Sequence, residues 1–166
     1  MDEKKIILRD ANMGDLESTV ELYKQLYTVE YHVENKICAN LMEPGEYFAS
    51  KGFKKETIYK KKCIKDPKIK FIVAVYEEKV IGYTNGFIKN YPAFLSKVLY
   101  GEEIVVNEEY QKHGVGDLLI QELIKWGKKK KAKQMVFNAF RDNKAAMSKY
   151  VNLGFKERHI CLYKQI

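Results

Sequence analysis

Residues 105–116 read VVNEEYQKHGVG, and this segment is the most informative in the chain about its fold. An apolar strand runs through Val106 into a polar loop, and Gly114 and Gly116 then open an amphipathic helix. The first turn of a helix carries backbone N–H groups without partners at the positive end of the helix dipole. Because glycine lacks a Cβ atom, an anion can approach the main chain closely here. The segment therefore predicts an anion site that suits a phosphate group.

The spacing of these glycines matches neither of the common nucleotide-binding loops, because the chain contains no GxxxxGK[ST] and no GxGxxG motif. On the glycines alone, an ordinary strand-to-helix turn explains the segment as well as an anion site does. The choice between the two interpretations depends on the rest of the chain.

Hydrophobic periodicity on either side of this segment predicts one mixed α/β domain over residues 1–166. Before the loop, the pattern favours a strand at 4–9, helices at 15–27 and 54–65, and strands at 71–76, 80–88 and 98–106. After it, we expect a helix at 114–130, a strand at 134–140, a helix at 143–153 and a strand at 155–163. Glu43-Pro44-Gly45 is interpreted as an interruption, and Gly154 as the left-handed residue that ends the last helix.

Length and composition exclude several classes of protein. With 166 residues, of which 46% are hydrophobic, the chain can bury a core, so a disordered protein is excluded. No apolar run reaches the roughly 20 residues of a membrane span, and none follows the N-terminal MDEKK as in a signal peptide, so we expect a cytoplasmic protein.

The three cysteines, Cys38, Cys63 and Cys161, are scattered along the chain, which predicts reduced thiols. No metal is expected, because no His, Cys and carboxylate set has ligand spacing.

The formal net charge of +8 is unevenly distributed. Residues 84–166 hold 15 basic and 8 acidic residues, and lysine clusters lie at 51–70 and 125–133. Such clusters suit an anionic cofactor, a nucleic acid or an anionic membrane surface. A solvated lysine face is the simpler interpretation, since the interleaved arginines and aromatic residues of a nucleic-acid groove are absent. The excess in the second half favours an anionic cofactor at the glycine loop.

Two motifs make the chain resemble the GNAT superfamily of N-acetyltransferases. Gln111-x-x-Gly114-x-Gly116 matches the pattern [RQ]-x-x-G-x-[GA] of the acyl-CoA pyrophosphate loop in that superfamily. Downstream, Asn143-x-x-Ala146-x-x-x-Tyr150-x-x-x-Gly154-Phe155 resembles its second signature at the expected distance. The order of the predicted strands and helices also matches, from about residue 5 to residue 164.

The resemblance implies a central, mostly antiparallel, twisted sheet of six to seven strands flanked by about four helices. It also implies that the fourth and fifth strands splay apart and that acetyl-CoA, the cosubstrate, lies in the gap. The main chain of Ile104, Val105 and Val106 would pair with the pantetheine arm as an added strand does. The remaining cofactor contacts are implied for Gln111, Lys112, His113, Gly114, Val115 and Gly116 at the pyrophosphate, for Asn138 on the fifth strand, and for Asn143, Ala146 and Tyr150.

The implied reaction is direct transfer of an acetyl group to a primary amine in a ternary complex. An amine is mostly protonated at neutral pH, so a base must accept a proton, and the departing thiolate must be neutralised. Tyr150 falls where many family members place a general acid near the sulfur, and a phenol of pKa about 10 can serve. A core tyrosine is the structural alternative, because Met147 and Leu153 share its helix face.

Glu102 and Glu103 interrupt an otherwise apolar strand, and burying a carboxylate is costly unless it is paired. Since neighbouring strand residues point to opposite faces, we expect at most one of them to line the acceptor side of the cleft. Residues 99–116 are similar to those of spermidine/spermine acetyltransferases, which carry a glutamate at the register of Glu102. The resemblance therefore favours Glu102 as the catalytic base, directly or through a water, and Glu103 after it. Pairing of both with lysines is the alternative.

The resemblance places the acceptor pocket between residues 27–48 and 90–97, and the acceptor is a small molecule or a peptide. The first of these segments contains aromatic and acidic residues, which suit a cationic amine. The alternative is that the aromatic residues belong to the core. The residues are Tyr27, Tyr31, Tyr47, Phe48, Glu30 and Glu34. Polyamines, aminoglycosides, amino acids and protein amines all stay open. A non-catalytic acyl-CoA-binding regulatory module and, ranked below it, a nucleic-acid-associated protein are the alternative functions. A homodimer is expected by family analogy alone.

Overall fold

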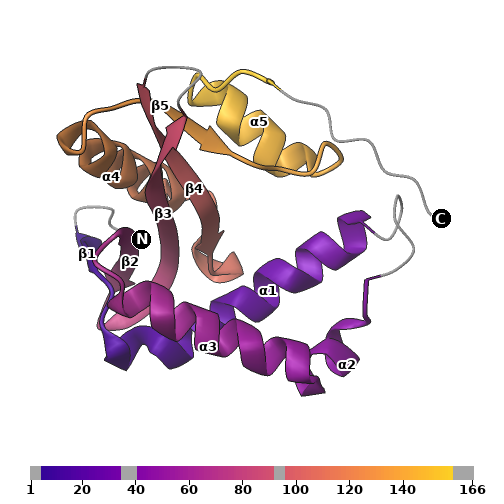
Figure 1. Cartoon of the computed structure of the whole chain (residues 1–166). Coiled ribbons are helices and arrows are strands. Elements are labelled where there is room, and N and C mark those ends of the chain that lie inside the picture. The colour runs from indigo at the N-terminus through magenta and orange to yellow at the C-terminus, as the bar shows by residue number, and fades with distance from the viewer. Residues whose placement is uncertain (1–4, 35–40, 92–95, 159–166) are drawn as a thin grey trace.

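A computed structural model describes residues 5–34, 41–91 and 96–158 (Figure 1). The strands in these ranges are β1 (Ile7–Asp10), β2 (Ile69–Tyr76), β3 (Lys79–Tyr91), β4 (Ser96–Val106) and β5 (Ala132–Phe137). The α-helices are α1 (Leu16–Glu34), α2 (Pro44–Ala49), α3 (Lys51–Lys65), α4 (Val115–Lys129) and α5 (Lys144–Asn152). Two 3-10 turns, η2 (Met13–Asp15) and η4 (Glu108–Tyr110), precede α1 and follow β4. None of these helices has the length and apolar character needed to cross a membrane.

The strands form one sheet in the order β1-β2-β3-β4-β5. The first three pairings are antiparallel and the β4–β5 pairing is parallel, so the expected mostly antiparallel sheet is confirmed. The expected number of six to seven strands is wrong for the described ranges, which contain five. The predicted strand at 155–163 is not seen at 155–158, and residues 159–163 lie outside the described part.

The end of α5 explains why no strand begins at residue 155. Gly154 takes a left-handed conformation with φ of 84°, as predicted. Its N–H donates to the carbonyl of Val151, and the Phe155 N–H donates to that of Tyr150, both at 2.9 Å. This pair of bonds is a Schellman motif, which holds the chain against the helix it has just left.

The helix count is five instead of about four, because α2 was not expected. Glu43 caps α2 by accepting hydrogen bonds from the N–H groups of Gly45 and Glu46, and Pro44 occupies the first turn. Proline breaks a helix interior but suits the first helical position, where its missing N–H costs nothing. Glu43-Pro44-Gly45 is therefore a helix start and not an interruption.

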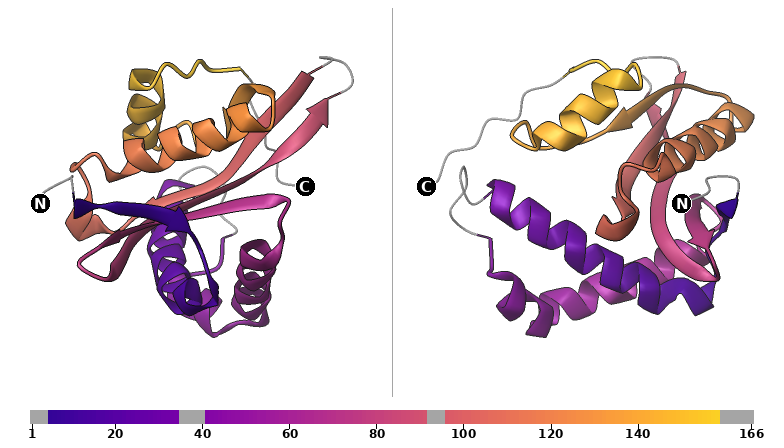
Figure 2. Two further views of the ribbon diagram at one scale, coloured as in Figure 1. Left: turned by 90° about the vertical axis from the view of Figure 1, so that its left-hand side faces the viewer. Right: turned by 180° about the vertical axis from the view of Figure 1, so that it is seen from behind.

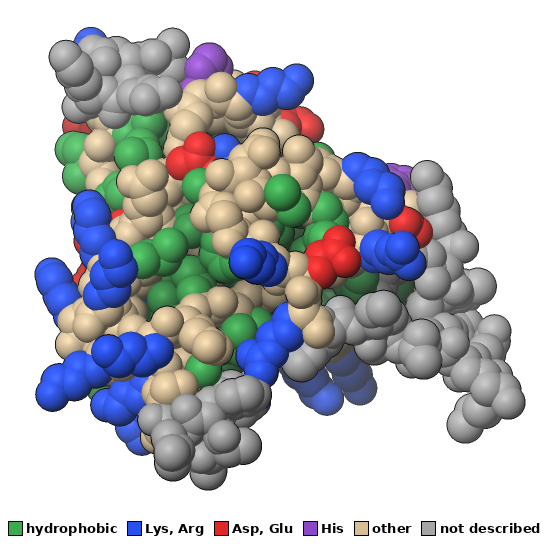
Figure 3. Space-filling model, turned by 90° about the horizontal axis from the view of Figure 1, so that it is seen from above, with side chains coloured by type: hydrophobic (Ala, Val, Ile, Leu, Met, Phe, Trp, Pro, Cys, Tyr) green, Lys and Arg blue, Asp and Glu red, His purple; other side chains and the backbone are tan. Residues whose placement is uncertain are grey.

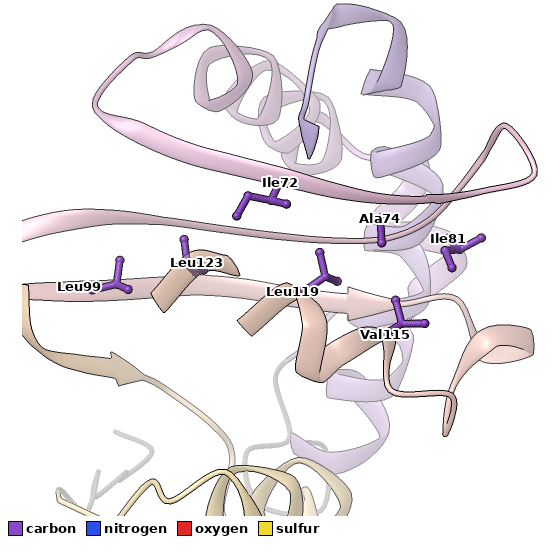
Figure 4. Packing of buried hydrophobic residues seen from close by; sticks show 7 residues of the cluster. All are labelled: Ile72, Ala74, Ile81, Leu99, Val115, Leu119 and Leu123. Carbon is purple, nitrogen blue, oxygen red and sulfur yellow. The ribbon is translucent and has the colours of Figure 1, made fainter. Parts of the chain in front are cut away.

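The sheet lies between two layers of helices, with α1 and α3 on one face and α4 and α5 on the other (Figure 2). Alternate side chains of β2 enter two separate cores: Ile72 and Ala74 pack toward α4, and Phe71 and Val73 pack toward α1 and α3. Val115, Leu119 and Leu123 of α4 complete the first core (Figure 4). Side chains therefore cover β2 on both faces, and the prediction of an amphipathic helix after the glycine loop is confirmed.

The register of β4 changes in its middle. Asn85 of β3 pairs with Glu103, whereas the next residue, Gly86, pairs with Gly101, so Glu102 is an extra residue in β4, a β-bulge. Pairing with β5 ends at the same place, because Gly101 and Phe137 form the last partner pair. Beyond it β4 continues for residues 102–106 and the two strands diverge (Figure 1).

The close approach of Phe137 to Gly101 predicts that Gly101→Ala destabilises the protein. A Cβ atom at Gly101 would lie 2.3 Å from the Phe137 ring, so the ring would have to move. We expect a loss of about 1–3 kcal/mol, typical of overpacking, and a lower Tm in thermal unfolding.

Gly116→Ala is the matched control, because its Cβ would come no closer than 3.8 Å to Val106. Its Tm should stay near that of the wild type. An unchanged Tm for Gly101→Ala would contradict the packing described at this point.

Candidate functional site

The loop between β4 and α4 has the shape of an anion site. Lys112 and Gly114 both take left-handed conformations, with φ of 64° and 74°, and turn the chain into α4. Gly114 is the N-cap residue of α4, and no side chain of the described residues caps this end of the helix. The first N–H groups of α4 are thus free of side-chain acceptors, at the positive end of its dipole.

The side chains of this loop contribute less than its main chain. Val115 is 1% exposed and belongs to the core, so only its N–H can contact a ligand. Lys112 and His113 are exposed. Gln111 is also exposed, and its Nε2 donates to the Val106 carbonyl at 3.1 Å, which ties the loop to the end of β4.

The end of β4 presents main-chain groups on the side that β5 has left. The Asn107 N–H donates to Ile81 at 2.9 Å, and bonding alternates along an antiparallel ladder. The N–H and C=O groups of Ile104 and Val106 therefore point away from β3, whereas Val105 is buried in the core under α1 and α3. This edge is the kind of surface to which an extended ligand adds as a further strand.

Gln25 of α1 fixes the end of this edge, and sequence analysis missed it. Its Nε2 donates to the Val106 carbonyl at 3.0 Å, and its Oε1 accepts from the Glu108 N–H at 3.1 Å. The two contacts join segments more than 80 residues apart in sequence. A single polar residue on a helix gives no signal of such a long-range contact.

Tyr150 lies in an aromatic cluster beside the point where β4 and β5 part. Its ring stacks on Phe137, with centroids 5.3 Å apart, and meets the edge of Phe155 at 5.5 Å. Burial, with a smaller contribution from the Glu30 carboxylate of α1, raises the pKa of Tyr150 to about 12. The phenol therefore keeps its proton at neutral pH and is available as a donor.

The other predicted residues near α5 have structural roles in the protein. Asn143 is the N-cap of α5, and its side chain accepts from the N–H of half-buried Ala146 at 3.1 Å. The placement of Asn138 on the fifth strand is wrong, because β5 ends one residue earlier at Phe137. Asn138 is exposed there, and its amide donates to the Tyr100 hydroxyl.

Glu102 and Glu103 both bond to side chains of α3 and so point to the same face of the sheet, whereas neighbouring residues of this strand were expected to point to opposite faces. The bulge is the reason, since the extra residue breaks the alternation of side chains along β4. Glu102 accepts from the Tyr59 hydroxyl at 2.6 Å and from Asn85 Nδ2 at 2.7 Å. Glu103 accepts from Lys60 Nζ at 2.6 Å, and Tyr59 and Lys60 are neighbours on α3.

The expected alternative, in which both glutamates pair with lysines, holds for Glu103 alone. In the described ranges Glu102 contacts neutral donors and forms no ion pair. Asn85, next to it, is 2% exposed, and its Oδ1 has no hydrogen-bond donor among the described residues. A buried carbonyl oxygen of this kind suits a water molecule or a ligand N–H.

The aromatic residues expected at the acceptor pocket pack mainly on one another. The rings of Tyr27 and Tyr47 stack with centroids 4.0 Å apart, and Phe48 meets Tyr27 edge-on at 5.7 Å. The ammonium of Lys24 lies 6.0 Å from the Phe48 ring. These contacts join α1 to α2, which favours the core interpretation. Residues 35–40 and 92–95 and the Glu34 side chain lie outside the described part.

The lysines at 125–133 lie at the wrong end of α4 to bind a ligand at Gly114. Lys128 and Lys129 stand in the last turn, and a helix of 15 residues is about 22 Å long. Seen from above, Lys and Arg side chains gather at the left edge of this face (Figure 3). Lys128 and Lys129, in the last turn of α4, stabilise the negative end of its dipole.

Comparison with known proteins gives a family match and many structures of the same fold. The model of the acetyltransferase (GNAT) family matches residues 21–155. Aminoglycoside N-acetyltransferase AAC(6')-Iy in complex with CoA is 20% identical, with a TM-score of 0.73 over 96% of this chain and 94% of that one. A transcriptional regulator from Bacillus halodurans C-125 is 19% identical, with a TM-score of 0.72 over 97% and 99% of the two chains.

A third similar structure is aminoglycoside acetyltransferase meta-AAC0020 from an uncultured soil metagenomic sample, in complex with sisomicin. It is 13% identical, with a TM-score of 0.69 over 99% of this chain and 98% of that one. At such low sequence identities the comparison shows a shared fold, and the substrates named for these structures are those of the relatives.

Proposed function

The chain belongs to the GNAT acetyltransferase family, and from this premise we propose that it transfers the acetyl group of acetyl-CoA directly to a primary amine in a ternary complex. As a GNAT enzyme it is an acetyl-CoA-dependent acyltransferase. We take residues 1–166 as one acetyltransferase domain. The observation that carries the proposal is the end of β4 beyond its pairing with β5, which the loop at 107–114 joins to an α4 N-terminus without a side-chain cap in the described ranges.

The edge and the helix end together suit the length and charge of acetyl-CoA, which supplies an activated acetyl thioester when bound. The main chain of Ile104 and the N–H group of Val106 would hold the pantetheine arm as an added strand does. The N–H groups that follow Gly114 would hold the pyrophosphate, and Gly116 lets it approach because no Cβ intervenes. The side chains of Gln111, Lys112 and His113 lie around this position and can add polar contacts.

Glu102 is our candidate for the base that accepts a proton from the amine. Its carboxylate is half-buried and is not neutralised by a cation in the described ranges, whereas Glu103 is bound to Lys60. Asn85 Oδ1, a buried acceptor next to it, can hold a water that relays the proton. The similarity of residues 99–116 to spermidine/spermine acetyltransferases stays part of this proposal.

Tyr150 is our candidate for the acid that donates a proton to the departing sulfur. Its raised pKa keeps the phenol protonated, and the stacked Phe137 fixes its ring beside the divergence of β4 and β5. Because burial weakens the phenol as an acid, we expect it to protonate a thiolate that is already forming and not to act before the thioester bond breaks.

The proposed acceptor is a cationic amine of a small molecule or a peptide. Glu30 lies near enough to Tyr150 to raise its pKa, so α1 brings a negative charge to the same region. Together with Glu102 it gives a field that attracts an ammonium group. The aminoglycoside acetyltransferases of the same fold make aminoglycosides a rational first panel, beside polyamines, amino acids and peptides.

The substitution Glu102→Gln tests whether Glu102 is the base that accepts the proton of the amine. Replacing the carboxylate by an amide removes the proton acceptor, so kcat/KM at neutral pH should fall by about 10²-fold or more in an assay of CoA thiol release. Activity should partly recover at high pH, where the free amine needs no base.

The matched control is Glu78→Gln, an exposed glutamate in the turn between β2 and β3, which should behave as the wild type. If Glu102→Gln retained full activity at neutral pH, another group would have to be the base.

Tyr150→Phe tests the acid. The variant keeps the aromatic packing on Phe137 and loses only the hydroxyl, so CoA affinity measured by calorimetry should be unchanged. Turnover should fall by about 10²-fold or more, because the thiolate leaves without a proton.

Tyr76→Phe serves as the control for removal of a hydroxyl on the sheet, and its turnover should match the wild type. Equal turnover in Tyr150→Phe and the wild type would show that Tyr150 is a core residue only.

A further inference from the structure

A buried lysine lies directly beside the two glutamates of β4. The side chain of Lys60 is 2% exposed, whereas the other six lysines of α3 are exposed to solvent. Lysine is almost never buried unless its charge is paired. The predicted lysine cluster at 51–70 therefore contains one member with a different role.

The contacts of Lys60 come from four elements of the fold, α1, α3, β3 and β4. Its Nζ lies 2.6 Å from Glu103 Oε2 and 3.7 Å from Glu56 Oε1. It also donates to the Tyr83 hydroxyl at 3.1 Å and lies 4.2 Å from the centre of the Tyr23 ring. Tyr83 in turn donates to the same oxygen of Glu103 at 2.8 Å. Lys60 and Glu103 thus form an ion pair whose two charged groups are also bridged by the Tyr83 hydroxyl.

Among the described residues around this ion pair, Lys60 is the one cation, because the other titratable groups nearby are neutral or acidic. Burial raises the pKa of Tyr23 and Tyr83, and raises that of Cys63 to about 11. Partial burial and the bond to Glu102 raise the pKa of Tyr59, so all four groups are neutral near pH 7.

Two carboxylates, those of Glu56 and Glu103, contact this one ammonium. Partial burial raises the pKa of Glu56, which marks it as a group that ionises reluctantly. Glu102 and Glu103 are adjacent in β4 and lie on one face, so their carboxylates stand side by side.

We propose that Lys60 is a positioning residue that gives the two glutamates different roles. By pairing with Glu103 at 2.6 Å it holds that carboxylate in an ion pair, where it is unavailable to substrate. Glu102 is then the one that keeps neutral partners, Tyr59 and Asn85, and can take a proton from the acceptor amine. This inference rests on the proposed function, in which Glu102 is the base.

Lys60→Met tests the inference through the pH dependence of kcat/KM. Methionine fills the space of the lysine chain without its charge. Without the ammonium, the negative charge of Glu103 beside Glu102 is no longer offset, so a second carboxylate there becomes less favourable. The acidic limb of the profile should therefore move to higher pH, and a move of about one unit is a tenfold loss of kcat/KM below the limb.

Two further variants separate electrostatics from folding. Glu103→Gln removes a neighbouring negative charge, so the acidic limb should move to lower pH. Lys60→Met/Glu103→Gln removes both charges and leaves no unpaired ion of the pair, so its limb should return toward that of the wild type. Lys61→Met, at an exposed neighbour on α3, is the control and should leave the limb in place.

The outcomes distinguish this inference from the proposed function. If Glu102→Gln abolishes the acidic limb while Lys60→Met and Glu103→Gln leave it where it is, the role of Lys60 is overturned and Glu102 remains the base. If Glu102→Gln keeps the wild-type limb, the proposed function itself fails. The inference is supported if the acidic limb moves to higher pH in Lys60→Met and to lower pH in Glu103→Gln.

Discussion

A single extra residue in β4 governs both sides of the candidate site. Glu102 has no partner of its own on β3, and pairing with β5 stops at Gly101, the residue before it. One consequence is that the main-chain groups of Ile104 and the N–H group of Val106 lie along an edge of β4 that β5 does not cover. The other is that Glu102 and Glu103 face the same helix, α3. In our proposal the first consequence binds the cosubstrate and the second supplies the base.

Much of the fold could be predicted because its signals are local. The apolar run of β2, the spacing of Val115, Leu119 and Leu123, and the glycine after α5 each fix an element within a few residues. The errors in the predicted elements came at residues whose type is compatible with two different local structures. Pro44, which was interpreted as a break, begins α2, and Phe155, which was expected to start a strand, packs on Tyr150.

The site divides in the same way. The loop at Gly114 follows from a short motif, and its left-handed glycine was within reach of sequence reasoning. The bulge depends on the register between β3 and β4, which no local pattern reports. Gln25 and Lys60 act on residues 81 and 43 positions away, and Lys60 is hidden in sequence among exposed lysines of the same helix. Pairwise contacts of this kind become visible only in three dimensions.

Amide hydrogen exchange with and without CoA tests most directly whether the freed edge of β4 and the uncapped helix form one cosubstrate site. The N–H groups of Ile104, Val106 and the first turn of α4 should exchange rapidly in the free protein and become protected together when CoA is added. Amides of β2, which are buried in both states, should not change. Protection that is absent from both segments, or confined to other surfaces, would contradict the account.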